Sequence, residues 1–330
     1  MRPSLAPRVL LVALTCAFSL TATVIPSPAA AATRPTGPLS LSTGSYFGAL
    51  VNPDRSTPSS TPAEVTSLQT QIGRRLDIVN HFYTYDQALG TQGEVQDIAG
   101  GRIPMVTWGA TSTTSINNGS QDAYITAQAN RLKNLGSPVI LRYFHEPEGA
   151  YRKTIVSSAA AYIAAWRRAR LLFATAGATN VVWMFTTTAY SFRVVPATSP
   201  QAYYPGNDHV DWIAADGYNF APGKPGAKWN NFQTIFGKWY AWASTMPKPL
   251  MVAEYGVMED PAIPNRKAAW YDEMRATVTT SMPLIQGVVA WSTTNTKEGN
   301  VYNWNVDSSP SALAAWKAMG DDPYFDPTGP

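Results

Sequence analysis

The sequence has almost no cysteine. Cys16, the single cysteine among 330 residues, lies inside the apolar run "VLLVALTCAFSL" near the N-terminus. Arg2 and Arg8 precede this run and small residues up to Ala32 follow it, which is the order of segments in a secretory signal peptide. We therefore expect residues 1–32 to be removed and the mature protein to be secreted into the extracellular space. A mature chain without cysteine has no disulfide framework and no thiol chemistry.

Charged residues are scarce as well. They make up 14% of the chain, with 25 Lys and Arg against 22 Asp and Glu. Loss of Arg2 and Arg8 with the signal peptide would bring the mature chain close to neutrality. A nearly neutral chain of this kind offers no broad basic surface for a polyanion. We expect no nucleic acid partner and, after signal removal, no membrane partner.

Motifs that define several other enzyme classes are absent. The chain contains no G-x-S-x-G elbow, no P-loop and no G-x-G-x-x-G, which argues against serine hydrolase, NTPase and dinucleotide-binding functions. The segment "HEPEG" begins like a zinc HExxH motif but carries Gly149 in place of the second histidine. His81, His145 and His209 are far apart in the sequence. We therefore expect neither a metal ion nor another cofactor.

Aromatic residues are abundant by contrast. The chain has 11 Trp and 16 Tyr. Their flat faces suit sugar rings, whose axial C–H groups pack on an aromatic ring, although large protein cores use tryptophan too. This composition is compatible with a carbohydrate ligand and does not require one.

Apolar runs typical of strands recur along the chain with room for a helix between them. The eight expected strands are residues 44–51, 76–85, 103–110, 138–146, 180–189, 210–219, 249–257 and 287–295. Helical patterns are expected within residues 61–75, 120–136, 157–177, 229–244 and 265–280. Strands that are apolar on both faces and alternate with helices indicate a parallel sheet. Eight such units predict an α/β fold, a single (β/α)8 TIM barrel, with an open doubly wound sheet as the alternative.

The barrel is expected to span residues 44–322. A Pro-, Thr- and Ser-rich tether is expected at residues 33–43 and a C-terminal tail at residues 323–330. No internal repeat or second domain is visible. A barrel of this size is expected to be a monomer.

The active site of such a barrel lies at the C-terminal ends of its strands. Two acids stand at expected strand ends, Glu146 in "VILRYFHEPEG" and Glu254 in "MVAEYGV". If Glu146 points into the barrel mouth, strand alternation turns Arg142 the same way, and an inward arginine needs a carboxylate partner such as Glu254. Tyr218 lies on the same strand face as Asp216, so its hydroxyl is expected at the same mouth.

Paired carboxylates in different surroundings are what glycoside hydrolysis requires, with one protonated as the acid and the other ionised as the nucleophile. Taken singly, Glu254 could be a salt-bridge partner and Glu146 a loop charge. Their joint occurrence at strand ends, with Arg142 and Tyr218 in supporting positions, favours the catalytic interpretation. Glu148 is interpreted as a solvated loop charge in preference to a third acid.

Taken together, these segments resemble those of glycoside hydrolase family 26, which comprises secreted β-mannanases and related β-glucanases. The similarity runs from about Gly44 to Met319. Its most specific segments are "LRYFHEPEG", "VVWMFTTTA", "YYPGNDHVDWIAADGYN", "KPLMVAEYGV" and "WNVDSSPSALAAW". The resemblance implies a retaining mechanism with Glu146 as acid/base and Glu254 as nucleophile.

The resemblance also implies roles for the residues around the two acids. His145 would contact the sugar or orient the acid, Tyr218 would hydrogen-bond the nucleophile, and Trp291 would form the floor beneath the −1 sugar. Further substrate contacts are expected at the other aromatic residues of the strand ends, namely Tyr83, Trp108 and Tyr151.

The sequence departs from the family's mannanases at positions that touch sugar recognition. Those enzymes usually read H-E-M-N-G followed by Trp, whereas this chain has Pro147, Glu148 and Tyr151 at the corresponding positions. They often carry a histidine after the third strand, where this chain offers only Trp108, Gly109 and Thr113. The reaction type is thus better indicated than the polysaccharide.

The leading expectation is an endo-β-1,4-mannanase acting on plant or cell-wall polysaccharide. Mixed-linkage β-glucanase and β-1,3-xylanase activities are the alternatives within the family. A barrel that binds cell-wall polysaccharide without cleaving it, and an inverting hydrolase, are the alternatives outside it. A pure binder has little use for a costly buried pair of acids, and an inverting enzyme would hold its carboxyl groups further apart.

Overall fold

The computed structural model describes Met1 and residues 33–52, 59–194, 199–297 and 299–327. Residues 34–330 form one compact unit, separate from residues 1–33, and the account that follows concerns that unit. The predicted signal peptide lies outside the described residues, apart from Met1.

Eight parallel strands close into a barrel. Each strand pairs with the next along the chain, and β1 pairs with β8 from Tyr46↔Gly287 to Asn52↔Thr293. This closure confirms the predicted (β/α)8 barrel and excludes the open sheet. The strands are β1 Tyr46–Asn52, β2 Ile78–Tyr83, β3 Ile103–Trp108, β4 Val139–Tyr143, β5 Val181–Thr188, β6 Trp212–Asn219, β7 Leu250–Val257 and β8 Ile285–Lys297.

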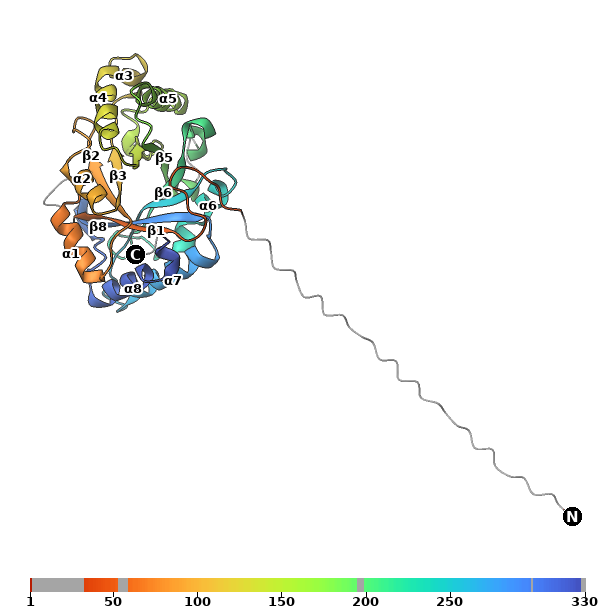
Figure 1. Ribbon diagram of the computed structural model, residues 1–330. Helices are drawn as coiled ribbons and strands as arrows, with labels where there is room; N and C mark the ends of the chain where they lie inside the picture. Colours follow the sequence, from red (N-terminus) through yellow and green to blue (C-terminus); the bar gives the residue numbers. More distant parts are fainter. Residues whose placement is uncertain (2–32, 53–58, 195–198, 298, 328–330) are drawn as a thin grey trace. The chain divides into compact units, whose positions relative to one another are not determined.

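Helices surround the strands on the outside of the barrel (Figure 1). They are α1 Pro62–Ile72, α2 Gln92–Ala99, α3 Thr113–Asn117, α4 Asp122–Lys133, α5 Ala159–Thr175, α6 Phe232–Ala243, α7 Arg266–Thr280 and α8 Pro310–Gly320. Short 3-10 helices are η1 Ala150–Arg152, η2 Ala189–Phe192, η3 Pro200–Tyr203, η4 Asn207–His209 and η5 Pro323–Phe325. Local signals set several starts, as at α1, where Thr61 and Glu64 form a capping box. The five predicted helices are confirmed as α1, α4, α5, α6 and α7.

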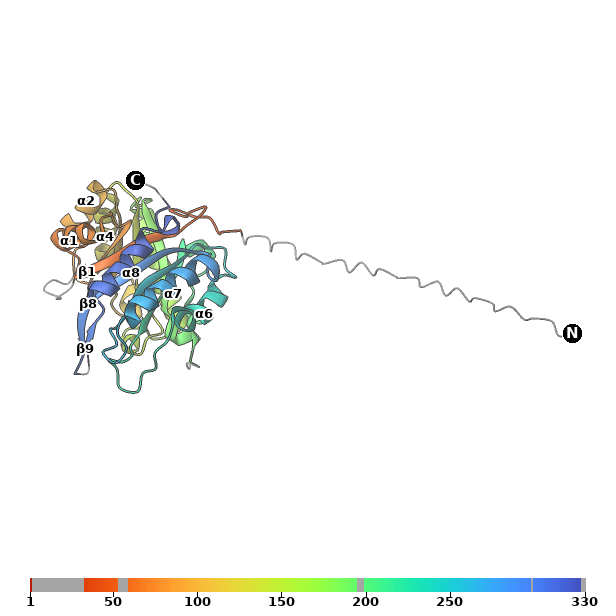
Figure 2. The same ribbon diagram turned by 90° about the horizontal axis from the view of Figure 1, so that it is seen from below.

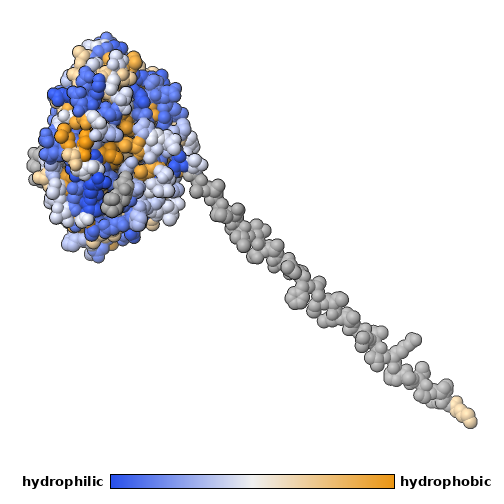
Figure 3. All heavy atoms as spheres, in the orientation of Figure 1, coloured by the Kyte–Doolittle hydropathy of each residue, from blue (hydrophilic) through white to orange (hydrophobic). Residues whose placement is uncertain are grey.

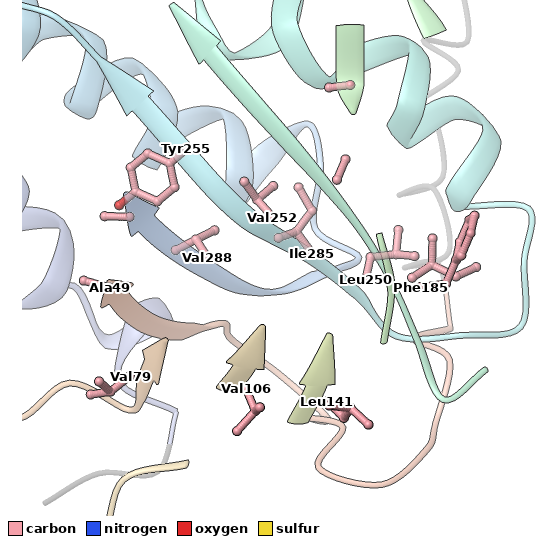
Figure 4. Close-up of a cluster of buried hydrophobic side chains, with 14 of the residues drawn as sticks. Ala49, Val79, Val106, Leu141, Phe185, Leu250, Val252, Tyr255, Ile285 and Val288 are labelled. Carbon is pink, nitrogen blue, oxygen red and sulfur yellow. The ribbon is translucent and has the colours of Figure 1, made fainter. Parts of the chain in front are cut away.

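Alternate side chains of each strand enter two separate apolar clusters. Outward-facing residues such as Val106, Leu141 and Val252 belong to a cluster that includes helix side chains, and Figure 4 shows these three projecting from their strands. Inward-facing residues fill the barrel itself, among them Met105 and Ile140. Both faces of the strands are therefore buried, as expected for a parallel sheet enclosed by helices.

Residues 34–43, where the composition predicts a tether, pack against the barrel at the N-terminal ends of its strands. Leu39 and Leu41 rest on the inner apolar cluster. Leu41 N–H donates to Gln286 Oε1 at 2.7 Å, and Trp212 Nε1 donates to the Pro38 carbonyl at 2.7 Å. This segment thus covers the end of the barrel opposite to the strand C-termini.

The final strand extends past the barrel. Beyond Thr293, β8 continues and pairs in antiparallel fashion with β9 (Asn300–Asn303), and the hairpin projects beyond the helices in Figure 2. At the C-terminus, Phe325 is fully buried and its ring lies 6.5 Å from that of Phe47. Among the described residues, no helix is long and apolar enough to cross a membrane.

The surface of this unit carries both hydrophilic and apolar side chains. Figure 3 shows apolar side chains gathered near the middle of one face and surrounded by hydrophilic ones. Most large apolar residues are nevertheless in the two clusters, and few are exposed singly, which is usual for a folded domain.

Candidate active site

The turn after β4 carries the first of the two predicted acids. The strand ends at Tyr143, three residues earlier than the sequence indicates, and Phe144 and Glu146 both have left-handed backbones with φ of 46° and 51°. Glu146 N–H donates to the Thr186 carbonyl on β5 at 2.8 Å, which fixes the turn. Left-handed conformations are costly for residues with a Cβ and cluster at functional sites.

The guanidinium of Arg142 lies inside the barrel with no exposed surface. It donates hydrogen bonds to the carboxylates of Glu254 on β7 and Asp216 on β6. It also reaches Thr107 Oγ1 at 3.3 Å. The predicted pairing of Arg142 with Glu254 is confirmed, and Asp216 is a second partner that the sequence argument did not assign. Ile140 is on the inner face of β4. Arg142 lies two residues later, and alternate residues of a strand share a face, so Arg142 also faces inward.

A β-bulge turns Glu254 into the barrel. Ala215 pairs with Val252 and Asp216 pairs with Glu254, so Ala253 is an extra residue on β7. The same strand shows a register shift against β8. Ala253 and Glu254 therefore both face inward, whereas Tyr255 joins the outer cluster. A bulge of this kind re-aims a side chain beside a functional site.

Tyr218 supports the same carboxylate from β6. Its hydroxyl donates to Glu254 Oε2, while Arg142 binds Oε1, so each oxygen of Glu254 has a donor. The prediction that Tyr218 shares a face with Asp216 and points into the mouth is confirmed. Gly256 makes room for this arrangement, since a Cβ there would stand 2.8 Å from the Tyr218 ring.

The charge balance around Glu254 has opposing contributions. Burial raises the pKa of Glu254, and the guanidinium of Arg142 lowers it, as do the hydrogen bonds from Tyr218 and Arg142. Burial also raises the pKa of Asp216 well above its ordinary value, with Arg142 again opposing and a hydrogen bond to Glu146 adding to the rise. The single cation of Arg142 is shared among the carboxyl groups of Glu254, Asp216 and Glu146. One buried cation cannot compensate several buried anions, so ionising all of these groups together is costly.

Glu146 lies at the same centre with a partner of its own. Tyr151, from η1, donates its hydroxyl to Glu146 Oε2. Gly149 permits this fold-back, because a Cβ there would stand 2.8 Å from the Tyr151 ring. Tyr151 is 56% exposed, so the acid end of the site is open to solvent while Glu254 is buried.

His145 and Trp291 also face the mouth. The His145 ring is buried against Phe82 at a centroid separation of 5.4 Å, and Phe82 is 6.0 Å from Trp291. Burial and the cations of Arg142 and Arg152 hold the pKa of His145 well below its ordinary value. His145 is thus a neutral imidazole. Trp291 is half-buried. It lies two residues after Val289, which belongs to the inner cluster, so it is on the inner face of β8.

The structure corrects the predicted substrate contact of Trp108 and shows where the Tyr83 hydroxyl points. Trp108 follows Thr107, which faces inward, so its own side chain points outward into the outer cluster with no exposed surface. It stacks on Tyr85 at 5.4 Å. Tyr83 likewise directs its hydroxyl outward, to Glu94 Oε1 at 2.5 Å on α2. The Trp108 side chain is therefore not available to a sugar at the mouth, whereas Tyr83 borders the hollow beside the acid with its hydroxyl turned away.

Glu148 is not a solvated loop charge. Its Oε1 accepts a hydrogen bond from Thr188 N–H at 2.6 Å, and its Oε2 is buried with no partner in the described part of the chain. Burial raises the pKa of Glu148 to about 7, opposed by the Thr188 hydrogen bond and reinforced by Glu146. Glu148 joins the turn after β4 to the end of β5.

An aromatic wall beside Tyr218 was not singled out by the sequence argument. Trp304 packs 5.0 Å from the Tyr218 ring and stacks on Tyr302 at 5.6 Å with an interplanar angle of 3°. Phe220, 37% exposed, packs 5.3 Å from Trp304. Tyr218 is on β6 and Phe220 directly follows that strand, whereas Tyr302 is on β9 and Trp304 directly follows it. The two pairs are far apart in the sequence, so no local signal shows that they meet.

Within the described ranges, no cluster of three or more His, Cys, Asp or Glu side chains has a metal-binding arrangement. The described residues at the mouth provide one buried carboxylate with two donors, a second carboxylate that is half-buried, and aromatic rings around both. A closed (β/α)8 barrel with two such acids at its mouth defines a barrel of the glycoside hydrolase type.

Comparison with known proteins gives the family. The pattern of Glycosyl hydrolase family 26 matches residues 109–271. Endoglucanase H of Acetivibrio thermocellus is 33% identical over 264 residues, which are 77% of this chain and 28% of that protein. The chain belongs to glycosyl hydrolase family 26, and it spans less than a third of the length of this curated relative.

Solved structures agree on the fold. A GH26 β-mannanase from Bacteroides ovatus superposes with a TM-score of 0.58 at 14% identity, covering 86% of this chain and 90% of that one. The catalytic domain of a Bacillus sp. JAMB-750 GH26 endo-β-1,4-mannanase gives a TM-score of 0.61 at 16% identity, covering 85% and 86%.

Proposed function

We propose that this protein is a secreted, retaining glycoside hydrolase that cleaves β-linked polysaccharide internally. Glu254 is the nucleophile and Glu146 the acid/base. The observation that carries the proposal is the pair of donors on Glu254: Arg142 on one oxygen and Tyr218 on the other. These donors fix the carboxylate in place and counter the burial that would otherwise favour its protonated form.

In the first step, Glu254 attacks the anomeric carbon while the Glu146 carboxyl protonates the leaving glycosidic oxygen. The bond between the sugars breaks and a glycosyl ester forms on Glu254. In the second step, Glu146 takes a proton from water, the water oxygen attacks the anomeric carbon, and the ester breaks. Tyr151 holds Glu146 near the leaving oxygen, and Trp291 lies beneath the sugar.

The leading substrate is a β-1,4-mannan, as the family resemblance suggests. A β-glucan is the second candidate, favoured by the 33% identity to a protein named endoglucanase H. Hydrolysis of glucomannan, galactomannan, lichenan and β-1,3-xylan, followed by product sizing, separates these substrates and separates internal from terminal cleavage. The departures at Pro147, Glu148 and Tyr151 lie beside the acid, where they affect sugar recognition, and Tyr151 also positions the acid.

The test of mechanism uses Glu146→Ala and Glu254→Ala with an activated aryl glycoside and azide. Azide should restore turnover in both variants and give glycosyl azides of opposite anomeric configuration, because it replaces water in Glu146→Ala and the nucleophile in Glu254→Ala. Arg131→Ala, an exposed change on α4, is the control. Full activity in either glutamate variant would contradict the proposal. Binding without hydrolysis by the wild type would favour the polysaccharide-binding alternative.

A further inference from the structure

A hollow of about 420 Å³ opens beside the acid end of the site. It lies between the C-terminal ends of β2 and β3 and the turn after β4. Its lining includes Phe82, Tyr85, Gly109, His145, Tyr151 and Arg152. Among the residues that the structure describes, no Asp or Glu contributes to this lining. Among the described lining residues, Arg152 carries the charge, since burial and the neighbouring arginines hold the pKa of His145 well below its ordinary value.

Arg152 is only 8% exposed, yet none of the described acidic residues pairs with it. Its Nε donates to the His145 carbonyl at 3.2 Å, and Nη2 lies 3.3 Å from each nitrogen of the His145 ring. The guanidinium sits 4.8 Å from the Tyr151 ring centroid and 5.6 Å from that of Phe144. Within the described ranges, no carboxylate oxygen comes within 4.0 Å of it, and its Nη1 has no hydrogen-bond partner.

Arg142, the other buried arginine among the described residues, is compensated differently. It is more enclosed than Arg152, with no exposed surface, and two carboxylates balance its charge. The less buried Arg102, Arg168 and Arg170 each hold an aspartate as well. A guanidinium taken from water without an anion is costly, and cation–π contacts with two rings compensate only in part. Such a group, facing a hollow next to the reacting atoms, is suited to an anion supplied from outside.

We propose that Arg152 binds an oxyanion carried by the polysaccharide, a carboxylate or a sulfate ester on a sugar near the cleaved bond. The fork of the guanidinium matches the two oxygens of such a group, and Tyr151 and Phe82 line the hollow around the ring that bears it. The substrate class is then an acidic β-glycan. This inference rests on the proposed hydrolase function and specifies its substrate.

The test compares β-glucans and glucomannans that are unsubstituted, lightly carboxymethylated or lightly sulfated. Wild type should cleave at least one anionic form with a kcat/KM about tenfold above that of its neutral parent, an advantage that falls as salt is raised. The carboxymethylated and sulfated arms identify which oxyanion is preferred. Arg152→Gln should remove the advantage, Arg152→Lys should keep part of it, and Arg131→Gln, which removes an exposed charge from α4, should keep all of it.

Two outcomes would overturn the inference. Equal losses on neutral and anionic substrates in Arg152→Gln would mean that Arg152 only positions His145. A wild type that cleaves neutral glycans and shows no anionic preference would also overturn it, without any variant having to fold. Failure of the proposed hydrolase function is distinguishable, because wild type would then cleave none of the substrates. Calorimetric titration with acidic and neutral oligosaccharides would still measure binding by the wild type. Equal affinity for the acidic and the neutral oligosaccharides would contradict the inference.

Discussion

Arg142 on β4 and Glu254 on β7 meet across the interior of the barrel, from strands that are not neighbours in the sheet. Asp216 on β6 holds the same guanidinium from a second direction. The three side chains are buried, so each depends on the others for the compensation of its charge. A change in one of them acts on the fold and on the catalytic carboxylate at once.

Replacement of Arg142 by Met is expected to remove activity and to destabilise the protein by about 3–5 kcal/mol, because Glu254 and Asp216 would remain buried without a counter-ion. Urea unfolding at several pH values measures the loss. The loss should shrink as pH is lowered, since protonation removes the uncompensated charges. A pH-independent loss would show that packing, and not charge, accounts for it.

Tyr218→Phe removes one donor from Glu254 and little apolar contact. A hydrogen bond to a charged group is worth roughly 1.5–3 kcal/mol, so kcat should fall about 10- to 100-fold. The Tyr218 hydrogen bond lowers the pKa of Glu254, and its loss therefore raises that pKa. The acidic limb of the kcat/KM profile should move to higher pH. Tyr190→Phe, at a 61% exposed position, is the control and should leave the profile unchanged.

The eight strands could be predicted from the sequence because long apolar runs in a parallel barrel are buried on both faces. The same property hides which way each side chain points. Trp108 and Thr107 are adjacent in one buried strand, and only the packing shows that Thr107 faces inward and Trp108 outward. The prediction for Trp108 was wrong for this reason.

The inward direction of Arg142 was predicted correctly, although the strand was expected to continue to Glu146. The strand ends at Tyr143, and left-handed residues set the direction of Glu146. The bulge at Ala253 is likewise invisible in "MVAEYGV", since it exists only as a mismatch in register with the two neighbouring strands. Burial of Glu148 depends on Thr188, 40 residues away, and no local pattern reveals such a contact.

The segment that covers the opposite end of the barrel offers a separate test. Leu39 and Leu41 pack on the inner cluster, far along the strands from the acids. The double change Leu39→Ala and Leu41→Ala should destabilise the protein by about 2–4 kcal/mol through lost burial. At temperatures where the variant stays folded, kcat should match wild type. Leu171→Ala, at a 65% exposed position, should have little effect on either quantity. A loss of kcat in the folded double variant would indicate that the two ends of the barrel are coupled.

Glu148 predicts a pH dependence of stability with a definite sign. Its pKa is about 7 in the native protein against an ordinary 4.5, so the native state holds more protons than the unfolded chain between these values. The free energy of unfolding should therefore fall as pH rises through this range, by roughly 3 kcal/mol at most from this group. Asp216 and Glu254 also have raised pKa values and add to the slope, so the comparison must be with a variant.

Glu148→Gln keeps the shape and the acceptor for Thr188 N–H but cannot ionise. Its urea-unfolding free energy should vary less with pH than that of wild type, with the difference appearing between pH 4.5 and 7 and remaining constant above pH 8. Asp208→Asn, at an exposed position, should reproduce the wild-type slope. Parallel profiles for wild type and Glu148→Gln would mean that Glu148 is ionised throughout, and that water reaches the Oε2 atom, which has no partner among the described residues.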